Sequence, residues 1–335
     1  MQIREYAAAD TDMVRQVVRV ANAQMRVDSP WDHEETALGW SHWLKNGWDG
    51  DAPRAFVCVD DGSVAAHGEL LMSSYDNLAL VEISIGVDPA RRRHGLGTSM
   101  LRRLIAESVA IGKASALMSG WDNAATRAFA AHHGFAPKLV EVCRRQTVAD
   151  LDWTEFERLR SEAVACAREY RILRVAGRTP TTLLPALAEL VGAINDAPND
   201  ELDIEDEVFP PERIERYEAR TIATNRLYRV IAQHRSTGAL AGHTVVAIEK
   251  DRPHIGEQDD TSVVAAHRGH RLGILLKAEM NVWLREVEPQ LGTIDTWNAK
   301  SNKHMIAVNE ALGYRPLGEI VNFQAPIADL PQNSR

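Results

Sequence analysis

Two short basic segments that contain glycine are the parts of this chain best suited to bind an anion. The first reads Arg92-Arg93-His94-Gly95-Leu96-Gly97, and the second reads Arg268-Gly269-His270-Arg271-Leu272-Gly273. An apolar run typical of a strand precedes each segment, and an amphipathic stretch typical of a helix follows it. Main-chain amides at the start of a helix, at the positive end of its dipole, can bind a pyrophosphate. Both segments therefore predict a site for a phosphate-rich cofactor.

The chain repeats itself over a long period. Three pairs of landmark residues lie 176 positions apart and three more lie 179 apart, so a single insertion of three residues accounts for both spacings. A period of this length indicates two copies of a whole domain rather than a solenoid. The pairs at 176 are Arg92/Arg268, Gly97/Gly273 and Trp121/Trp297, and the pairs at 179 are Asn123/Asn302, Gly134/Gly313 and Phe135/Tyr314.

The expected elements alternate between strands and helices, with hairpins among them. This order predicts a mixed α/β (α+β) sheet rather than a doubly wound parallel one. In the first copy we expect strands at 3–6, 54–59, 64–72, 78–87, 114–119 and 135–146, and helices at 11–25, 95–112 and 123–132. In the second we expect strands at 170–176, 227–233, 240–248, 258–264, 293–297 and 317–323, and helices at 183–195, 272–287 and 303–312.

On these residues the chain resembles a tandem member of the GNAT superfamily of N-acyltransferases. The family's cofactor motif is Gln/Arg-x-x-Gly-x-Gly/Ala, and Arg92 to Gly97 match it in full. The second segment has Arg271 where the motif has its first glycine. The family's later signature is an asparagine that opens a helix ending in Gly-aromatic, and it follows at Asn123 and at Asn302. A dinucleotide-binding turn is excluded, because neither segment has its third glycine.

The resemblance implies two tandem GNAT-like acyl-coenzyme A N-acyltransferase domains. We place them at residues 1–148 and 170–335, joined by a linker helix at 149–169. It further implies acetyl-coenzyme A as the cofactor, and transfer of the acetyl group to a small-molecule amine by direct attack in a ternary complex. Two other functions stay open. One is a non-catalytic acyl-coenzyme A sensor or partner-binding module, and the other is acetylation of a protein or peptide.

The resemblance also assigns the cofactor contacts. In the family, the strand before the loop diverges from its neighbour, and the thioester lies in the opening with main-chain amides as oxyanion donors. The implied contacts are Val87, Arg92, Arg93, His94, Gly95, Leu96, Gly97, Thr98 and Asn123 in the first copy, and Val263, Arg268, Gly269, His270, Arg271, Leu272, Gly273 and Asn302 in the second.

The reaction requires a base near the amine. An alkylammonium group, with a pKa of about 10, is almost wholly protonated at pH 7 and cannot attack a thioester. Glu82, ten residues before Arg92, lies close to where many family members keep a general-base glutamate. The position 176 residues further on is Gln258, which cannot accept the proton. Asp260 is therefore the candidate base of the second copy.

The usual proton donor of the family is missing. Many relatives place a tyrosine seven residues after the helix-opening asparagine, where it protonates the leaving thiolate. The residues at that spacing here are Ala130 and Asn309. The first copy keeps both loop glycines and the glutamate, and for that reason we favour it as the catalytic copy.

Composition narrows the class of partner. The net charge of −9 argues against nucleic acid or an anionic membrane as the main partner. The 3 cysteines cannot build a disulfide framework, and no His or Cys spacing indicates a metal site. No apolar run approaches the roughly 20 residues that span a bilayer. We expect a cytoplasmic protein, monomer or homodimer, that binds a small-molecule amine and neither nucleic acid, membrane nor metal.

Two further features each allow two interpretations. The tryptophans at 31, 40, 43 and 48 could form the wall of an acceptor pocket, or they could pack a helical segment onto the sheet. The acidic run at 201–207 could attract a cationic acceptor, or it could be a solvated loop.

Overall fold

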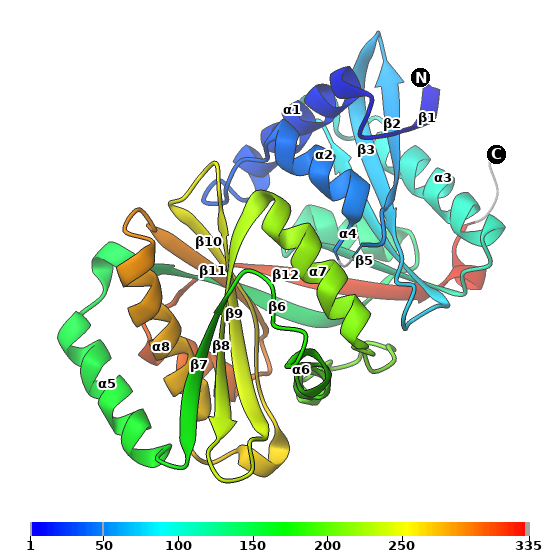
Figure 1. Cartoon of the computed structure of the whole chain (residues 1–335). Coiled ribbons are helices and arrows are strands. Elements are labelled where there is room, and N and C mark those ends of the chain that lie inside the picture. Colours follow the sequence, from blue (N-terminus) through cyan, green and yellow to red (C-terminus); the bar gives the residue numbers. More distant parts are fainter. Residues whose placement is uncertain (1, 49, 332–335) are drawn as a thin grey trace. The chain divides into compact units, whose positions relative to one another are not determined.

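The computed structural model describes residues 2–48 and 50–331 (Figure 1). The chain forms two compact units that are discontinuous in sequence. The first unit comprises Met1–Val140, Asp200–Asp206 and Gly318–Arg335, and the second comprises Glu141–Asn199 and Glu207–Leu317. Residues 1 and 332–335, where the predicted domains begin and end, lie outside the described residues.

The first unit is a mixed sheet with helices on both faces. Its strand order is β1-β2-β3-β4-β5-β12, in which β4 and β5 are parallel and the other neighbours are antiparallel. The mixed α/β fold expected from the sequence is confirmed. The strands are β1 (Gln2–Tyr6), β2 (Arg54–Asp60), β3 (Ser63–Leu71), β4 (Leu80–Val87) and β5 (Ser115–Trp121), and the helices are α1 (Thr11–Asp28), α2 (Ala37–Asn46), α3 (Leu96–Ala110) and α4 (Ala124–His132).

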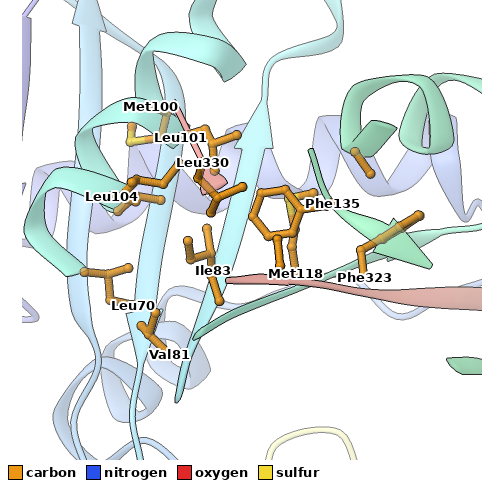
Figure 2. Packing of buried hydrophobic residues seen from close by; sticks show 14 of the residues in the cluster. Leu70, Val81, Ile83, Met100, Leu101, Leu104, Met118, Phe135, Phe323 and Leu330 are labelled. Atoms are coloured by element: carbon orange, nitrogen blue, oxygen red, sulfur yellow. The ribbon is translucent and has the colours of Figure 1, made fainter. Parts of the chain in front are cut away.

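Apolar clusters cover the two faces of this sheet. Phe56 of β2 packs with Leu104 of α3 on one face, and its neighbour Val57 packs with Val17 of α1 on the other. Consecutive residues serve opposite faces because side chains alternate along a strand. Figure 2 shows the cluster on the α3 side, where Ile83 of β4 lies among leucine, methionine and phenylalanine side chains.

The second unit repeats this plan. Its strand order is β6-β11-β10-β9-β8-β7, and β10 and β11 form its parallel pair. The strands within this unit are β7 (Tyr170–Ala176), β8 (Asn225–His234), β9 (Leu240–Glu249), β10 (Ile255–Val263) and β11 (Thr293–Ala299). The helices are α5 (Trp153–Cys166), α6 (Leu184–Val191), α7 (Pro211–Thr224), α8 (Leu272–Val287) and α9 (Lys303–Ala311).

The two copies exchange their last strands. β6 (Ala136–Thr147) follows the first copy in sequence, but its residues from Glu141 onward pair with β11. β12 (Arg315–Pro326) follows the second copy, but its residues from Ile320 onward pair with β5. The compact units therefore differ from the contiguous domains 1–148 and 170–335. Either strand would satisfy the alternating pattern of either sheet, so the sequence repeat could not indicate the exchange.

Two helices differ from expectation. The joining helix α5 is shorter than 149–169, and it packs on α8 through Phe156 and Ala163 as part of the second unit's core. Helix α7 was not predicted. Its signal was present, because Pro210 and Pro211 precede apolar residues at helical spacing, and proline favours the first turn of a helix.

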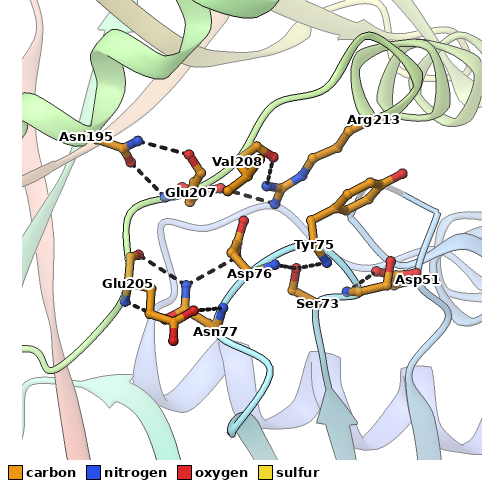
Figure 3. A network of polar contacts seen from close by, with 11 residues as sticks. Asp51, Ser73, Tyr75, Asp76, Asn77, Asn195, Glu205, Glu207, Val208 and Arg213 are labelled. Carbon is orange, nitrogen blue, oxygen red and sulfur yellow. Dashed lines mark hydrogen bonds and ion pairs between the residues drawn. The ribbon is translucent and has the colours of Figure 1, made fainter.

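Both ambiguous features have a definite structure. Trp40 and Trp43 lie in α2 and pack on the cluster beneath α1, as the packing interpretation predicts. Residues 201–206 of the acidic run form an extended segment that hydrogen bonds hold within the first unit, whereas Glu207 belongs to the second unit. Asn77 Oδ1 accepts from the Glu205 amide at 2.8 Å, and Glu205 Oε2 accepts from the Asn77 amide at 2.9 Å (Figure 3). Asp203 is held in the same way by Gln324.

Candidate cofactor and acetyl-transfer site

The two loops share one backbone conformation. In the first, Arg93 has φ 67° and Gly95 has φ 79°; in the second, Gly269 has φ 87° and Arg271 has φ 55°. Each loop thus has two left-handed positions, with one glycine and one arginine in opposite order. Glycine adopts this conformation freely, whereas Arg271 adopts it against a steric penalty. The missing motif glycine therefore does not change the course of the second loop.

Main-chain amides are available at both helix starts. The first intrahelical bonds run from Ser99 N–H to the Gly95 carbonyl and from Leu275 N–H to the Arg271 carbonyl. Across the described ranges, no side chain caps the N-terminus of either α3 or α8. The first three amides of each helix therefore have no intrahelical acceptor, which suits a diphosphate. Leu96, by contrast, is anchored in the core, so only its main chain can contact a ligand.

The first arginine of each motif holds its loop to the rest of its unit. Arg92 forms a bidentate ion pair with Asp28 at 2.9 and 2.5 Å, and Arg268 pairs with Asp196. The Nε of Arg268 also donates to the carbonyl of Val263 at 3.1 Å, where the strand ends. These arginines were predicted to contact the cofactor, and their guanidinium groups here neutralise carboxylates.

Other predicted contacts also have partners within the protein. Asn123 and Asn302 cap α4 and α9, accepting from the amides of Thr126 at 2.9 Å and Met305 at 3.1 Å. Their side-chain oxygens thus stabilise helix starts. Arg271 Nη1 donates to Glu162 of α5 at 3.0 Å.

The remaining loop side chains differ in their surroundings. His94 is exposed and its Nδ1 lies 2.8 Å from the Arg92 carbonyl, and Thr98 Oγ1 lies 3.1 Å from His133 Nε2. His270 packs beside the ring of Tyr170. A Cβ on Gly97 would lie 3.3 Å from Phe129. Gly97 therefore allows α3 and α4 to approach closely.

The parallel strands diverge just before each loop. β4 pairs with β5 only as far as Ile83 and Met118, and β10 pairs with β11 only as far as Glu257 and Asp295. Beyond these points the main-chain groups that face the parallel neighbour have no ladder partner. An opening of this kind can admit a thioester and offer it N–H donors.

A β-bulge changes the correspondence between the copies. Glu82 pairs with Leu71, whereas the residue opposite Ala247, 176 positions after Leu71, is Glu257. The register of β10 shifts between Gln258 and Thr261, which inserts one residue. The predicted equivalence of Glu82 with Gln258 is therefore wrong, because a fixed offset fails across an inserted residue.

Gln258 and the aspartates lie on different faces of β10. Gln258 is buried on the α8 side, where Nε2 donates to Thr244 Oγ1 at 2.6 Å and Oε1 accepts from Tyr314 at 3.2 Å. Asp259 and Asp260 form the bulge, and Asp259 accepts a hydrogen bond from Tyr217 of α7. Burial, followed by the charge of Asp259, raises the pKa of Asp260 to about 6. A carboxylate with this pKa suits proton removal near neutrality.

Two buried histidines next to the loops are not among the predicted site residues. His67 in β3 and His243 in β9 lie 176 residues apart, which was a detectable signal, and both are at most 4% exposed. His67 Nδ1 lies 2.9 Å from Glu69 Oε1. His243 Nδ1 accepts from Arg229 at 2.9 Å, and burial and the Arg229 charge lower the pKa of His243.

Each histidine faces the strand that diverges. Their cross-strand partners are Gly86 in β4 and Ser262 in β10. A Cβ on Gly86 would lie 2.0 Å from His67 Nε2, so glycine is required there. No described group is a hydrogen-bond partner of His67 Nε2, His243 Nε2 or the Ser262 hydroxyl.

Comparison with known proteins agrees with this geometry. Residues 15–135 match the model of the acetyltransferase (GNAT) family. A tandem GNAT protein of the clavulanic acid biosynthesis pathway is 23% identical, with a TM-score of 0.79 over 97% of this chain and 98% of that one. The chain is a tandem GNAT-fold protein. The family match lies in the first copy, and the structural likeness extends the fold to both.

Two further solved structures are similar to the chain at lower sequence identity. A GCN5-related N-acetyltransferase from Sphaerobacter thermophilus is 16% identical, with a TM-score of 0.69 over 100% of this chain and 97% of that one. A glucosamine N-acetyltransferase region of a fungal β-N-acetylglucosaminidase is 11% identical, with a TM-score of 0.66 over 97% of this chain and 38% of that one. No curated protein sequence matches the chain. Within the described part of this GNAT-fold chain, no helix has the length and apolarity to cross a bilayer.

Proposed function

We propose that this tandem GNAT-fold protein is an acetyl-coenzyme A-dependent N-acetyltransferase that acts on a small-molecule amine. The observation that carries the proposal is the helix start that the chain builds twice. In each copy, a left-handed turn leads from a diverging strand into an uncapped helix. Three amides and the helix dipole then converge on one point, as binding of a diphosphate requires.

Different residues of the chain would bind the cofactor, accept the proton and stabilise the developing negative charge. The amides of Leu96, Gly97 and Thr98, and those of residues 272–274, would hold the diphosphate. Acetyl-coenzyme A supplies an activated acetyl thioester. Glu82 in the first copy and Asp260 in the second would accept the proton of the acceptor ammonium, directly or through water. Main-chain amides of the diverging strands would stabilise the negative charge that develops on the carbonyl oxygen.

The experiment disables each helix start in turn. Gly97→Glu and Gly273→Glu each introduce a carboxylate at a helix start that would bind phosphate. Gly97→Ala is the control for the 3.3 Å contact that a Cβ at this position makes with Phe129. A Cβ on Gly273 meets no atom within 4 Å, so this substitution does not disturb the packing. Gly192→Glu, at a similarly open position, is the matched control. Acetyl-coenzyme A at about 100 times its Kd would raise the free energy of unfolding by about 2.7 kcal/mol.

Thiol release over a panel of small amines, amino acids and peptides completes the test. We expect the double variant Gly97→Glu/Gly273→Glu to lose both the stabilisation and the release, and Gly192→Glu to retain them. Stabilisation of the unsubstituted protein without thiol release for any acceptor would identify an acyl-coenzyme A sensor instead. Release with peptides alone would identify a protein acetyltransferase. No stabilisation by millimolar acetyl-coenzyme A would refute the proposal.

A further inference from the structure

The second copy has a polar cluster where the first copy has an apolar core. In the first copy these positions pack as a continuous hydrophobic cluster beneath α3, part of which Figure 2 shows. In the second copy, each of the four counterparts is polar and at most 4% exposed. The corresponding pairs are Ile83 and Gln258, Leu101 and Lys277, Ala130 and Asn309, and Phe135 and Tyr314.

Because the chain contains two copies of one fold, the first copy shows what the second would be like with apolar residues at these positions. The first copy shows that apolar side chains at these positions support the fold. Burying a lysine and an asparagine instead costs free energy, because both lose hydration. Burial lowers the pKa of Lys277 to about 7, which reflects the cost of taking its charged form out of water. A feature that weakens the core without being needed for the fold indicates a function.

The cluster contains a directed chain of hydrogen bonds. Lys277 Nζ donates to Asn309 Oδ1 at 2.7 Å, and Asn309 Nδ2 donates to Asn298 Oδ1 at 2.6 Å. Nζ of Lys277 and Nδ2 of Asn309 are the donors in these two contacts, so the side-chain oxygens of Asn309 and Asn298 are the acceptors. The donor at the end of the chain is therefore the Nδ2 of Asn298. Successive hydrogen bonds polarise one another, which strengthens this donor.

Asn298 lies where β11 has left β10. It is three residues beyond Asp295, the last residue of β11 that pairs with β10, and it is partly exposed. Thr296, two residues earlier, still reaches the Gln258 carbonyl at 3.3 Å. The chain thus runs from the buried interior to the opening that would admit the thioester. The residue 176 positions before Asn298 is Asp122, which forms an ion pair with Arg127 in the first copy.

We propose that Asn298 donates a hydrogen bond to the sulfur of coenzyme A in the second copy, with Asn309 and Lys277 as positioning residues. The proposal rests on the acetyltransferase function above. As the amine forms its bond to the acetyl carbon, the C–S bond breaks and its electron pair stays on sulfur. The nitrogen loses a second proton as the amide forms; Asp260 accepts it after passing the ammonium proton to water, and the sulfur keeps the hydrogen bond without receiving a proton from the chain. After release the thiolate takes a proton from water, since an alkyl thiol such as that of cysteine has a pKa of about 8.5.

Binding measurements test the proposal without knowledge of the acceptor. In the full chain carrying Gly97→Glu, which restricts binding to the second copy, titration calorimetry compares coenzyme A with desulfo-coenzyme A. At about pH 9.5, where most of a thiol with a pKa of about 8.5 is ionised, we expect coenzyme A to bind roughly tenfold more tightly, because the sulfur then accepts a hydrogen bond as an anion. Asn298→Ala should abolish this preference and leave desulfo-coenzyme A binding unchanged. Lys277→Leu/Asn309→Ala, which introduces the residue types that the first copy has at these positions, should reduce the preference for coenzyme A.

Asp122→Ala, at the equivalent position of the first copy, is the matched control and should keep the preference. The thiol pKa of bound coenzyme A, followed by ultraviolet absorbance, gives a second readout, which a purely structural role would not move. The thiol pKa of bound coenzyme A should rise in Asn298→Ala. If the Asn298→Ala variant does not fold, Asn298→Ser takes its place, and the thiol pKa should rise there too. The inference would be overturned if all variants kept the same preference for coenzyme A over desulfo-coenzyme A. It would also be overturned if a cluster variant bound both ligands equally more weakly. The proposed function would stand in either case. Absence of binding by both ligands before any cluster substitution would overturn both.

Discussion

Gly95 and Arg271 occupy the same left-handed position at the starts of α3 and α8, with φ of 79° and 55°. The two loops therefore have the same backbone conformation at this position, although one has glycine and the other arginine. A Cβ on Gly95 would meet no atom within 4 Å, so its cost would be backbone strain alone. We predict that Gly95→Ala lowers the free energy of unfolding by about 1 kcal/mol. Denaturant titration measures it, and Gly192→Ala, at φ −55° with equal space, should not lower it.

The ion pair between Arg92 and Asp28 makes a second prediction. Asp28 neutralises the guanidinium next to the proposed diphosphate site. Asp28→Asn should strengthen coenzyme A binding to the first copy by about two- to fivefold, and added salt should reduce this gain. Calorimetry in the Gly273→Glu background measures it. Asp12→Asn, which breaks an exposed pair with Arg15 in the same helix, should have no effect.

Asp260 predicts how activity depends on pH. A carboxylate accepts a proton only when ionised, and the pKa of Asp260 is raised to about 6. The kcat/KM of the second copy, measured in the Gly97→Glu background, should therefore rise with pH through about 6 and then level off. Asp259→Asn should shift this limb to lower pH, since the charge of Asp259 contributes to the raised pKa. Asp260→Asn should abolish the rise of kcat/KM near pH 6. An unchanged pH profile in both variants would exclude Asp260 as the base.

Lys277 predicts how stability depends on pH. Burial lowers its pKa from 10.5 to about 7, so between these values the unfolded chain binds the proton and the folded protein does not. Stability of the unsubstituted protein should therefore rise with pH over this window. Lys277→Leu/Asn309→Ala should be more stable at pH 7, by at most about 5 kcal/mol, and the gain should shrink toward pH 10. Urea unfolding across this range measures it, and a pH-independent difference would contradict it.

The strand exchange predicts that the first copy cannot fold by itself. Val321 and Phe323 of β12 are at most 2% exposed within its core. Residues 1–148 alone lack β12 and this burial, which contributes about 2 kcal/mol or more for each large side chain. We predict that residues 1–148 alone show no cooperative thermal transition. A chain ending at residue 331 should melt like the full protein, and adding a peptide of residues 315–331 should partly restore the first unit.

The sequence determined what depends on local pattern. Strand and helix periodicity and the repeat with its 176-residue spacing predicted two copies of a mixed α/β fold and the two basic loops. Loop glycines and helix-opening asparagines are local signals, because their backbone requirements are met within a few residues. A local pattern did not reveal α7, although its paired prolines and apolar spacing could have done so.

Tertiary structure decided what depends on pairing. Gln258 shares its offset with Glu82, but the bulge in β10 turns it into the α8 core and brings Asp259 and Asp260 to the other face. Which sheet receives β6 or β12, and whether Lys277 meets Asn309, depends on residues far apart in the chain. Main-chain pairing is nearly independent of residue type, so a sequence that specifies each strand leaves the choice of its partner to the packing of the whole fold.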